Sequence, residues 1–295
     1  MKRRSEIIMM IFVTIIMGCS APKVIVSHRA NAETAEAEGR FEAATQAWNQ
    51  YFDQQLAAGS EISPEEYARA AKTAYRANEV ALAESWFGMA QYRNYADPDM
   101  YQALAAIYQQ QNNLNKELAV LEAYQENYPE QADTAGISVR LFDRYIQMGN
   151  KENALKIWPF MSAEKRKEEK YLNQYFLIQR QLDQKESCDT IAGQLLEINP
   201  RHTDALEWLG DKYYRMAEDR YQLEMKKYEN KRTHLQHLQL VQELKLVTAD
   251  FQQALTYFKV LWEMNPGPKY APYLVNIYTR FENPEQANYY RKYLK

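Results

Sequence analysis

The chain has 295 residues, with 36 basic and 39 acidic side chains and a net charge of −3 at neutral pH. This balance argues against nucleic acid as the main partner, because nucleic-acid binding needs a concentrated positive surface. Only 9 residues are glycine. Tight turns, β-bulges and phosphate-binding loops depend on glycine, so the composition favours an all-helical chain and disfavours a nucleotide-binding loop.

The N-terminus is typical of an export signal. Residues 2–4 are basic and residues 7–17 form an apolar run of 11 residues, which is too short to cross a bilayer as a helix. Residues 16–19, Ile-Met-Gly-Cys, resemble the lipoprotein box of bacteria. The alternative is an ordinary signal peptide followed by an unrelated cysteine.

The resemblance to the lipoprotein box implies a processed and anchored protein. We expect a signal peptide over residues 1–18, a lipid on Cys19 and a linker over residues 19–29. Ser20 resembles the residue that sorts lipoproteins to the outer membrane, so we expect a cell-envelope protein at that membrane, facing the periplasm. If Cys19 carries lipid, Cys188 has no disulfide partner in the chain, and packing alone must stabilise the fold.

The stretch from Asp97 to Pro129 predicts two short helices, each with one apolar face. Asp97 is a typical N-cap residue, and the proline that follows it suits the first helical position. Apolar or small side chains recur at spacings of three and four on both sides of a polar break at residues 111–113. Neither helix can bury its apolar face alone, so we expect neighbours of the same kind.

Similar units recur along the chain at a spacing of about 34 residues. Small residues stand where two helices would cross, and large rings stand where a core would form. Pro159, in the fourth unit, predicts an early end to that unit's second helix. The positions that carry the pattern best are Gly39, Ala43 and Trp48, then Ala71, Ala83, Phe87 and Ala90, then Leu141, Tyr145, Gly149 and Ala154.

This pattern resembles the tetratricopeptide repeat (TPR) over residues 30–295, nearly the whole mature chain. The resemblance implies an all-α fold, a right-handed α-solenoid of about seven TPR-like helix pairs with a concave groove. In the sixth pair, helical periodicity continues from Tyr213 to Tyr228 and resumes from Leu235 to Ala254. We therefore expect an antiparallel helical hairpin over about residues 213–254, projecting from the solenoid.

The first helix of each pair lines the groove in TPR proteins, and carrying those positions over assigns candidate partner-binding residues. They are mainly basic and aromatic, the types in which protein interfaces are enriched. The alternative is that these side chains only face solvent, because a solvated groove would also carry arginines. Both interpretations stay open. The candidates are Arg69, Lys72, Tyr75, Arg76, Arg140, Arg180, Trp208, Tyr214, Arg215, Tyr273 and Arg280.

Other reactive or charged residues have ordinary structural interpretations. Cys188 stands where two helices should touch, so we expect a buried packing residue rather than a nucleophile. His234 and His237 are three residues apart, but no further metal ligands stand at a suitable spacing. The basic residues of the hairpin tip are either solvated or attracted to anionic lipid headgroups. Tyrosines of the groove either pack or stack on sugars.

The sequence carries no nucleotide-binding loop, no hydrolase or metalloprotease motif and no cysteine cluster. We therefore expect no enzyme, no metal and no cofactor. The leading interpretation is a lipid-anchored scaffold that binds other envelope proteins, with the membrane reached through the lipid. Two alternatives stay open: a module that binds or cleaves glycans or peptidoglycan, and an accessory factor in outer-membrane protein assembly.

Overall fold

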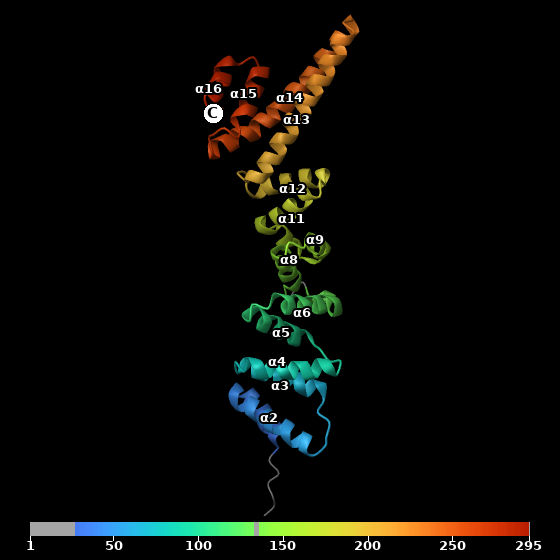
Figure 1. The fold of residues 1–295 in the computed structure, drawn as a ribbon, viewed down its shortest axis with the longest axis vertical. Helices are drawn as coiled ribbons and strands as arrows, with labels where there is room; N and C mark the ends of the chain where they lie inside the picture. Colours follow the sequence, from blue (N-terminus) through green and yellow to red (C-terminus); the bar gives the residue numbers. More distant parts are fainter. Residues whose placement is uncertain (1–26, 133–135, 295) are drawn as a thin grey trace, which may run out of the picture. The chain divides into compact units, whose positions relative to one another are not determined.

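The computed structural model describes residues 27–132 and 136–294, and every regular element in those residues is a helix (Figure 1). Apart from short one-turn helices, fourteen helices follow one another in the described residues, in the order that the predicted all-α solenoid of seven pairs requires. The chain divides into two compact units, the first ending at Asn113 and the second beginning at Leu114.

The expected signal peptide, the Cys19 anchor and all but the end of the expected linker lie outside the described residues. Within the part that the structure describes, no helix is both long enough and apolar enough to cross a membrane. The first helix that the structure describes begins at His28, two residues before the start of the repeat region expected at residue 30.

The first unit contains two helix pairs and a fifth helix, α5. Successive helices pack in pairs, and α5 packs against both helices of the pair before it. The helices are α1 (His28–Ala37), α2 (Phe41–Ala57), α3 (Pro64–Arg76), α4 (Val80–Tyr92) and α5 (Pro98–Gln110).

Local sequence signals position the helix starts in this unit. The Ser63 hydroxyl accepts a hydrogen bond from the Glu66 N–H, and the Glu66 carboxylate accepts one from the Ser63 N–H, which forms a capping box at the start of α3. The Asp97 carboxylate accepts a hydrogen bond of 2.7 Å from the Met100 N–H at the start of α5. Rings fill the core between pairs: Phe52 lies 4.8 Å from Tyr67, measured between ring centroids.

The second unit contains the remaining helices in the same alternation. It begins with α6, and a short 3₁₀ turn follows α9. The elements are α6 (Leu114–Asn127), α7 (Pro129–Ala132), α8 (Ile137–Gln147), α9 (Lys151–Ile157), η1 (Trp158–Phe160), α10 (Ala163–Arg166), α11 (Glu169–Gln181), α12 (Lys185–Ile198), α13 (Thr203–Asn230), α14 (His234–Met264), α15 (Ala271–Arg280) and α16 (Pro284–Arg291).

The fourth pair is shortened, as Pro159 predicted. Helix α9 has only seven residues, and η1, which contains Pro159, follows it at once. After η1, the structure divides the charged run 164–170 between α10 and α11. The reason is local: Ser162 caps the single turn of α10, and Glu168 then adopts an extended conformation, so the chain must restart its helix at Glu169.

The predicted hairpin is confirmed. Helices α13 and α14 have 28 and 31 residues and extend together beyond α15 and α16 (Figure 1). Between them, the Arg220 guanidinium pairs with Glu243 at 3.2 Å and with Asp250 at 3.6 Å. Buried Ala217, Val247 and Phe251 join the pair to the core of the unit.

The base of the hairpin depends on a glycine. A Cβ atom on Gly210 of α13 would lie 3.2 Å from the Phe258 ring of α14, closer than an ordinary contact. Phe258 is itself only 2% exposed, and its ring stacks on Tyr273 at a centroid distance of 4.2 Å. Glycine therefore lets two long helices approach each other at the point where α15 joins them.

Candidate functional site

The four groove residues predicted in the first unit lie on one helix, α3: Arg69, Lys72, Tyr75 and Arg76. The Arg69 guanidinium pairs with two carboxylates of α1, Glu33 at 2.9 Å and Glu36 at 2.7 Å. The Lys72 ammonium pairs with Asp97, the cap of α5, at 3.0 Å. These two cations therefore link α3 to the helix pairs on either side of it.

A shallow pocket of about 370 Å³ gathers the other predicted residues of this unit. Tyr75 and Arg76 line it together with Lys72, Asp99 and Gln102. Arg76 is exposed. The structure thus brings three of the four predicted groove residues to one surface.

In the second unit, three predicted arginines also link neighbouring pairs. Arg140 of α8 pairs with Glu117 of α6 at 2.8 Å, and Arg180 of α11 pairs with Asp204 of α13 at 3.1 Å. Arg280 of α15 makes two contacts with Glu218 of α13, at 3.2 and 3.0 Å. The guanidinium groups expected to bind a partner are engaged within the chain, and they hold the stack together.

Four predicted residues meet in a second pocket, of about 330 Å³, between α11, α13 and α15. Arg180, Trp208, Arg215 and Tyr273 line it, and acidic side chains of α13 neutralise its cations. The Trp208 indole N–H donates to Asp189 at 2.8 Å, and Arg215 pairs with Asp211 at 2.7 Å. The remaining lining residues are Glu207, Asp211, Phe258, Lys269 and Tyr270.

The predicted groove tyrosines of the second unit pack against other rings. Tyr273 stacks on Phe258, and Tyr214 contacts Phe251 edge to face at 5.8 Å. Burial raises the pKa of the Tyr214 hydroxyl, which accepts a hydrogen bond from the Asn276 amide. Ring faces that are covered in this way are not platforms for a sugar, so packing is their main role.

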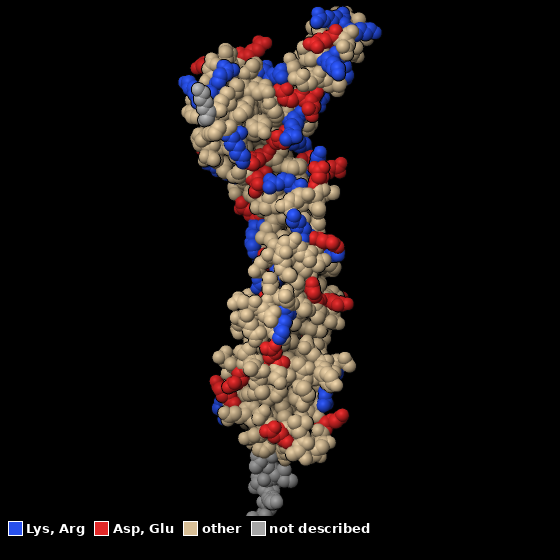
Figure 2. Space-filling view, viewed as in Figure 1, with Lys and Arg blue, Asp and Glu red and all other residues tan. Residues whose placement is uncertain are grey.

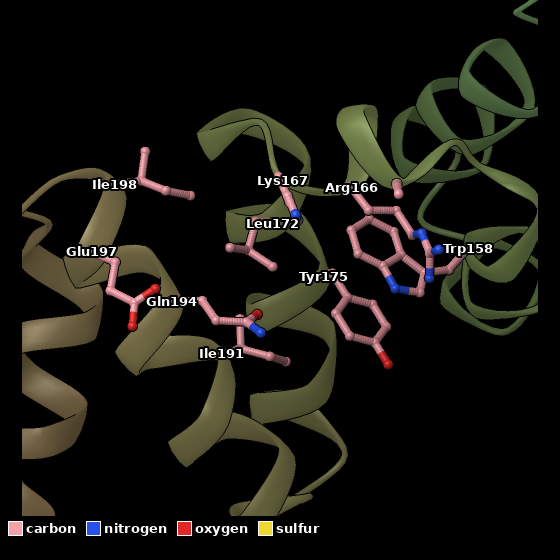
Figure 3. Close-up of a pocket in the computed structure, with 10 residues that line it drawn as sticks. Trp158, Arg166, Lys167, Leu172, Tyr175, Ile191, Gln194, Glu197 and Ile198 are labelled. Atoms are coloured by element: carbon pink, nitrogen blue, oxygen red, sulfur yellow. The ribbon is translucent and has the colours of Figure 1, made fainter.

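A further pocket in the second unit was not predicted from the sequence. It has a volume of about 560 Å³ and lies where the short helix α9 ends. Trp158 of η1, Leu172 and Tyr175 of α11, and Ile191 and Ile198 of α12 supply its apolar lining (Figure 3). We call it the Trp158 pocket. A second helix of ordinary length would continue past Ile157, so the pocket is a consequence of the break at Pro159.

The Trp158 pocket has stacked rings at its base and charged side chains at its rim. The Trp158 and Tyr175 rings stack 4.3 Å apart and 3° from parallel. Arg166 lies beside Trp158, with Glu197 and Ile198 on the opposite side (Figure 3). The Arg166 Nε atom is shielded from solvent and finds no hydrogen-bond partner among the residues that the structure describes. A buried donor without an acceptor is costly, so this group favours a ligand that supplies an acceptor.

Cys188, His234 and His237 do not line the pockets described above. Cys188 is fully buried, and this burial raises the pKa of its thiol, with a further contribution from Asp189, so the nucleophilic thiolate is disfavoured. Within residues 27–132 and 136–294, no group of three or more His, Cys, Asp or Glu side chains is placed to hold a metal. His234 and His237 lie on the exposed tip of the hairpin.

The chain matches no protein-family model and no curated protein. Among solved structures it is similar to a tetratricopeptide repeat protein from Parabacteroides merdae, with 12% identity, 90% of each chain covered and a TM-score of 0.41. The C-terminal part of a TPR repeat-containing protein from Cytophaga hutchinsonii gives 13% identity, coverage of 89% of this chain and 92% of that chain, and a TM-score of 0.39.

A TPR repeats protein from Bacteroides fragilis is similar at 15% identity, with 90% of this chain and 96% of that chain covered and a TM-score of 0.34. These similarities are weak, so the fold of this chain is described from its own helices.

Proposed function

We propose that this protein is a non-catalytic scaffold that binds other proteins of the bacterial envelope. In this proposal a lipid on Cys19 holds it at the outer membrane on the periplasmic side. The N-terminal sequence supports the anchor. The Trp158 pocket supports the binding function, because it is preformed, apolar at its base and polar at its rim, as small recognition sites are.

The chemistry of the Trp158 pocket defines the kind of segment that it would accept. Its floor of Leu172, Ile191 and Trp158 suits one apolar side chain. At the rim, Arg166 and Lys167 outnumber the single carboxylate of Glu197. An extended segment of a partner protein with an apolar residue beside a carboxylate would bury the first and give Arg166 an acceptor.

Site-specific photo-crosslinking in cells tests this binding function. A photoreactive residue in place of Ile198, which is 44% exposed at the pocket, should give a covalent product with one partner protein. The matched control is Glu186, which is exposed at the other end of α12. The charge reversal Lys167→Glu should weaken the Ile198 product. Equal products from both positions, or none from Ile198, would contradict the proposal.

The anchor has a separate test. Cells that produce the full chain should incorporate an alkyne-labelled fatty acid into it and retain it in the outer-membrane fraction. The Cys19→Ala variant should lose both the label and the membrane retention. A label that persists in Cys19→Ala would refute the anchor while leaving the binding proposal intact.

A further inference from the structure

The tip of the α13–α14 hairpin has a composition unlike the rest of the chain. Residues 222–242 carry four basic and two acidic side chains, a net charge of +2, in a protein whose overall charge is −3. Figure 2 shows Lys and Arg gathered at this end of the hairpin. We define the hairpin tip as residues 222–242.

Most of these cations have no ion-pair partner among residues 27–132 and 136–294. Lys227 pairs with Glu224 at 2.5 Å. By contrast, no carboxylate in the described residues lies within ion-pair distance of the charged groups of Lys226, Lys231 or Arg232. This differs from the arginines of the stack, which join one helix pair to the next. These three side chains therefore do not join one helix to another, and their charges are available to bind an external anion.

The same segment exposes large apolar side chains. Leu223 on α13 is 54% exposed, and Leu235, Leu238 and Val241 on α14 are 65%, 50% and 40% exposed. The three α14 residues follow one another at a spacing of three, which places them on one face of the helix. Leu240, the buried residue between them, turns toward the opposite face. Exposed leucines beside unpaired cations are the combination that binds at a lipid interface.

We propose that the hairpin tip docks on a membrane surface rich in anionic phospholipid. Lys226, Lys231 and Arg232 would contact the headgroups, while Leu235 and Leu238 enter the boundary between headgroups and acyl chains. This contact is peripheral and is independent of both the Cys19 anchor and the Trp158 pocket. The alternative occupant is a second copy of the hairpin, which would pair along the length of α14 rather than at its end.

Leu246 separates these two alternatives. It is exposed at 48%, but it lies 11 residues from Leu235, about 16 Å along the helix axis at 1.5 Å per residue. A docked tip leaves Leu246 in water, whereas a hairpin paired side by side with another would bury it. Leu246→Gln is therefore a control matched in residue type, exposure and helix to Leu235→Gln.

The test is hydrogen exchange of the full chain, read by mass spectrometry, on vesicles of phosphatidylcholine alone and on an equal mixture with phosphatidylglycerol. The N-terminus is the same in both, so only local protection of residues 222–242 reports the tip. Anionic vesicles should slow exchange there, and higher salt should reverse the effect. The double variants Leu235→Gln/Leu238→Gln and Lys231→Glu/Arg232→Glu should each weaken the protection by about tenfold or more, whereas Leu246→Gln should retain it.

Three results would overturn the proposal. The first is equal exchange at the tip on the two kinds of vesicle. The second is protection that survives in the Leu235→Gln/Leu238→Gln variant. The third is protection that appears without vesicles, grows with protein concentration and is lost in Leu246→Gln, which would identify a second hairpin as the occupant.

Discussion

At the scale of single residues, Asp97 has two roles in the first unit. Its carboxylate caps α5 through the Met100 N–H and pairs with Lys72 of α3. Burial by itself would raise the pKa of Asp97, but these two hydrogen bonds outweigh it, and the pKa lies below its ordinary value. One short side chain thus fixes both the start of α5 and its attachment to α3.

Two substitutions separate these roles. Asp97→Asn keeps a capping oxygen and loses the charge, so it should lower the free energy of unfolding by up to about 1 kcal/mol at neutral pH. Asp97→Ala loses both interactions and should cost about 1–2 kcal/mol. Urea unfolding followed by circular dichroism measures the differences. Equal losses in both variants would show that the cap adds nothing beyond the ion pair, and an Asp97→Asn variant as stable as wild type would show that the ion pair adds nothing.

The pH dependence follows from the sign of the pKa shift. A carboxyl whose folded pKa lies below its unfolded value of about 3.9 stabilises the fold above that value. This contribution is lost as the pH falls through the folded pKa. Wild-type protein should therefore lose more stability than Asp97→Asn when the pH is lowered from neutral to about 3. Parallel losses in the two proteins would argue against the assigned shift.

At the scale of elements, the junction of α13 and α14 depends on the close approach at Gly210. A methyl group there would meet the Phe258 ring, which is held between α13 and Tyr273 and has little room to move. Gly193 of α12 is the contrasting case, since a Cβ at that position would meet nothing within 4 Å. Both glycines lie inside helices, where alanine has the higher intrinsic propensity.

The two glycines should therefore respond to alanine with opposite signs. Gly193→Ala should stabilise the protein by up to about 1 kcal/mol through helix propensity alone. In Gly210→Ala the same gain is opposed by displacement of Phe258, and we expect a net loss of about 1 kcal/mol. Thermal unfolding of the two variants side by side measures the contrast. Stabilisation by Gly210→Ala would mean that the ring relaxes without cost.

At the scale of the whole molecule, stability is expected to be local, because helix pairs contact mainly their neighbours in each unit. In the second unit, Leu274→Ala removes a fully buried side chain from α15. It should expose the amides of α15 and α16 to fast hydrogen exchange and leave α11 and α12 protected. Uniform loss of protection across the unit would instead indicate that it unfolds as a single cooperative block.

Features set by local sequence were predictable. The period of α13 and α14, the cap at Asp97, and the early end at Pro159 all depend on residues within one or two helical turns. For this reason, the all-α fold and the hairpin followed from the sequence.

Features set by distant neighbours were not predictable. Arg280 and its partner Glu218 are 62 residues apart, so the sequence placed this arginine in the groove without its counter-charge. The Trp158 pocket needs the end of α9 and the exposed side of α12 to be brought together. Pro159 predicted that the helix before it would end early. The spacing of residues did not indicate which side chains this early end would expose.

The length of the hairpin can change without altering the packing at its base. Helices α13 and α14 continue past the Arg220–Glu243 ion pair and extend beyond α15 and α16 (Figure 1). Seven residues added to each arm would move the turn outward by about 10 Å and leave the base in register. Reach could therefore vary among descendants of this chain, or in engineered versions, while the repeats that anchor it stay the same.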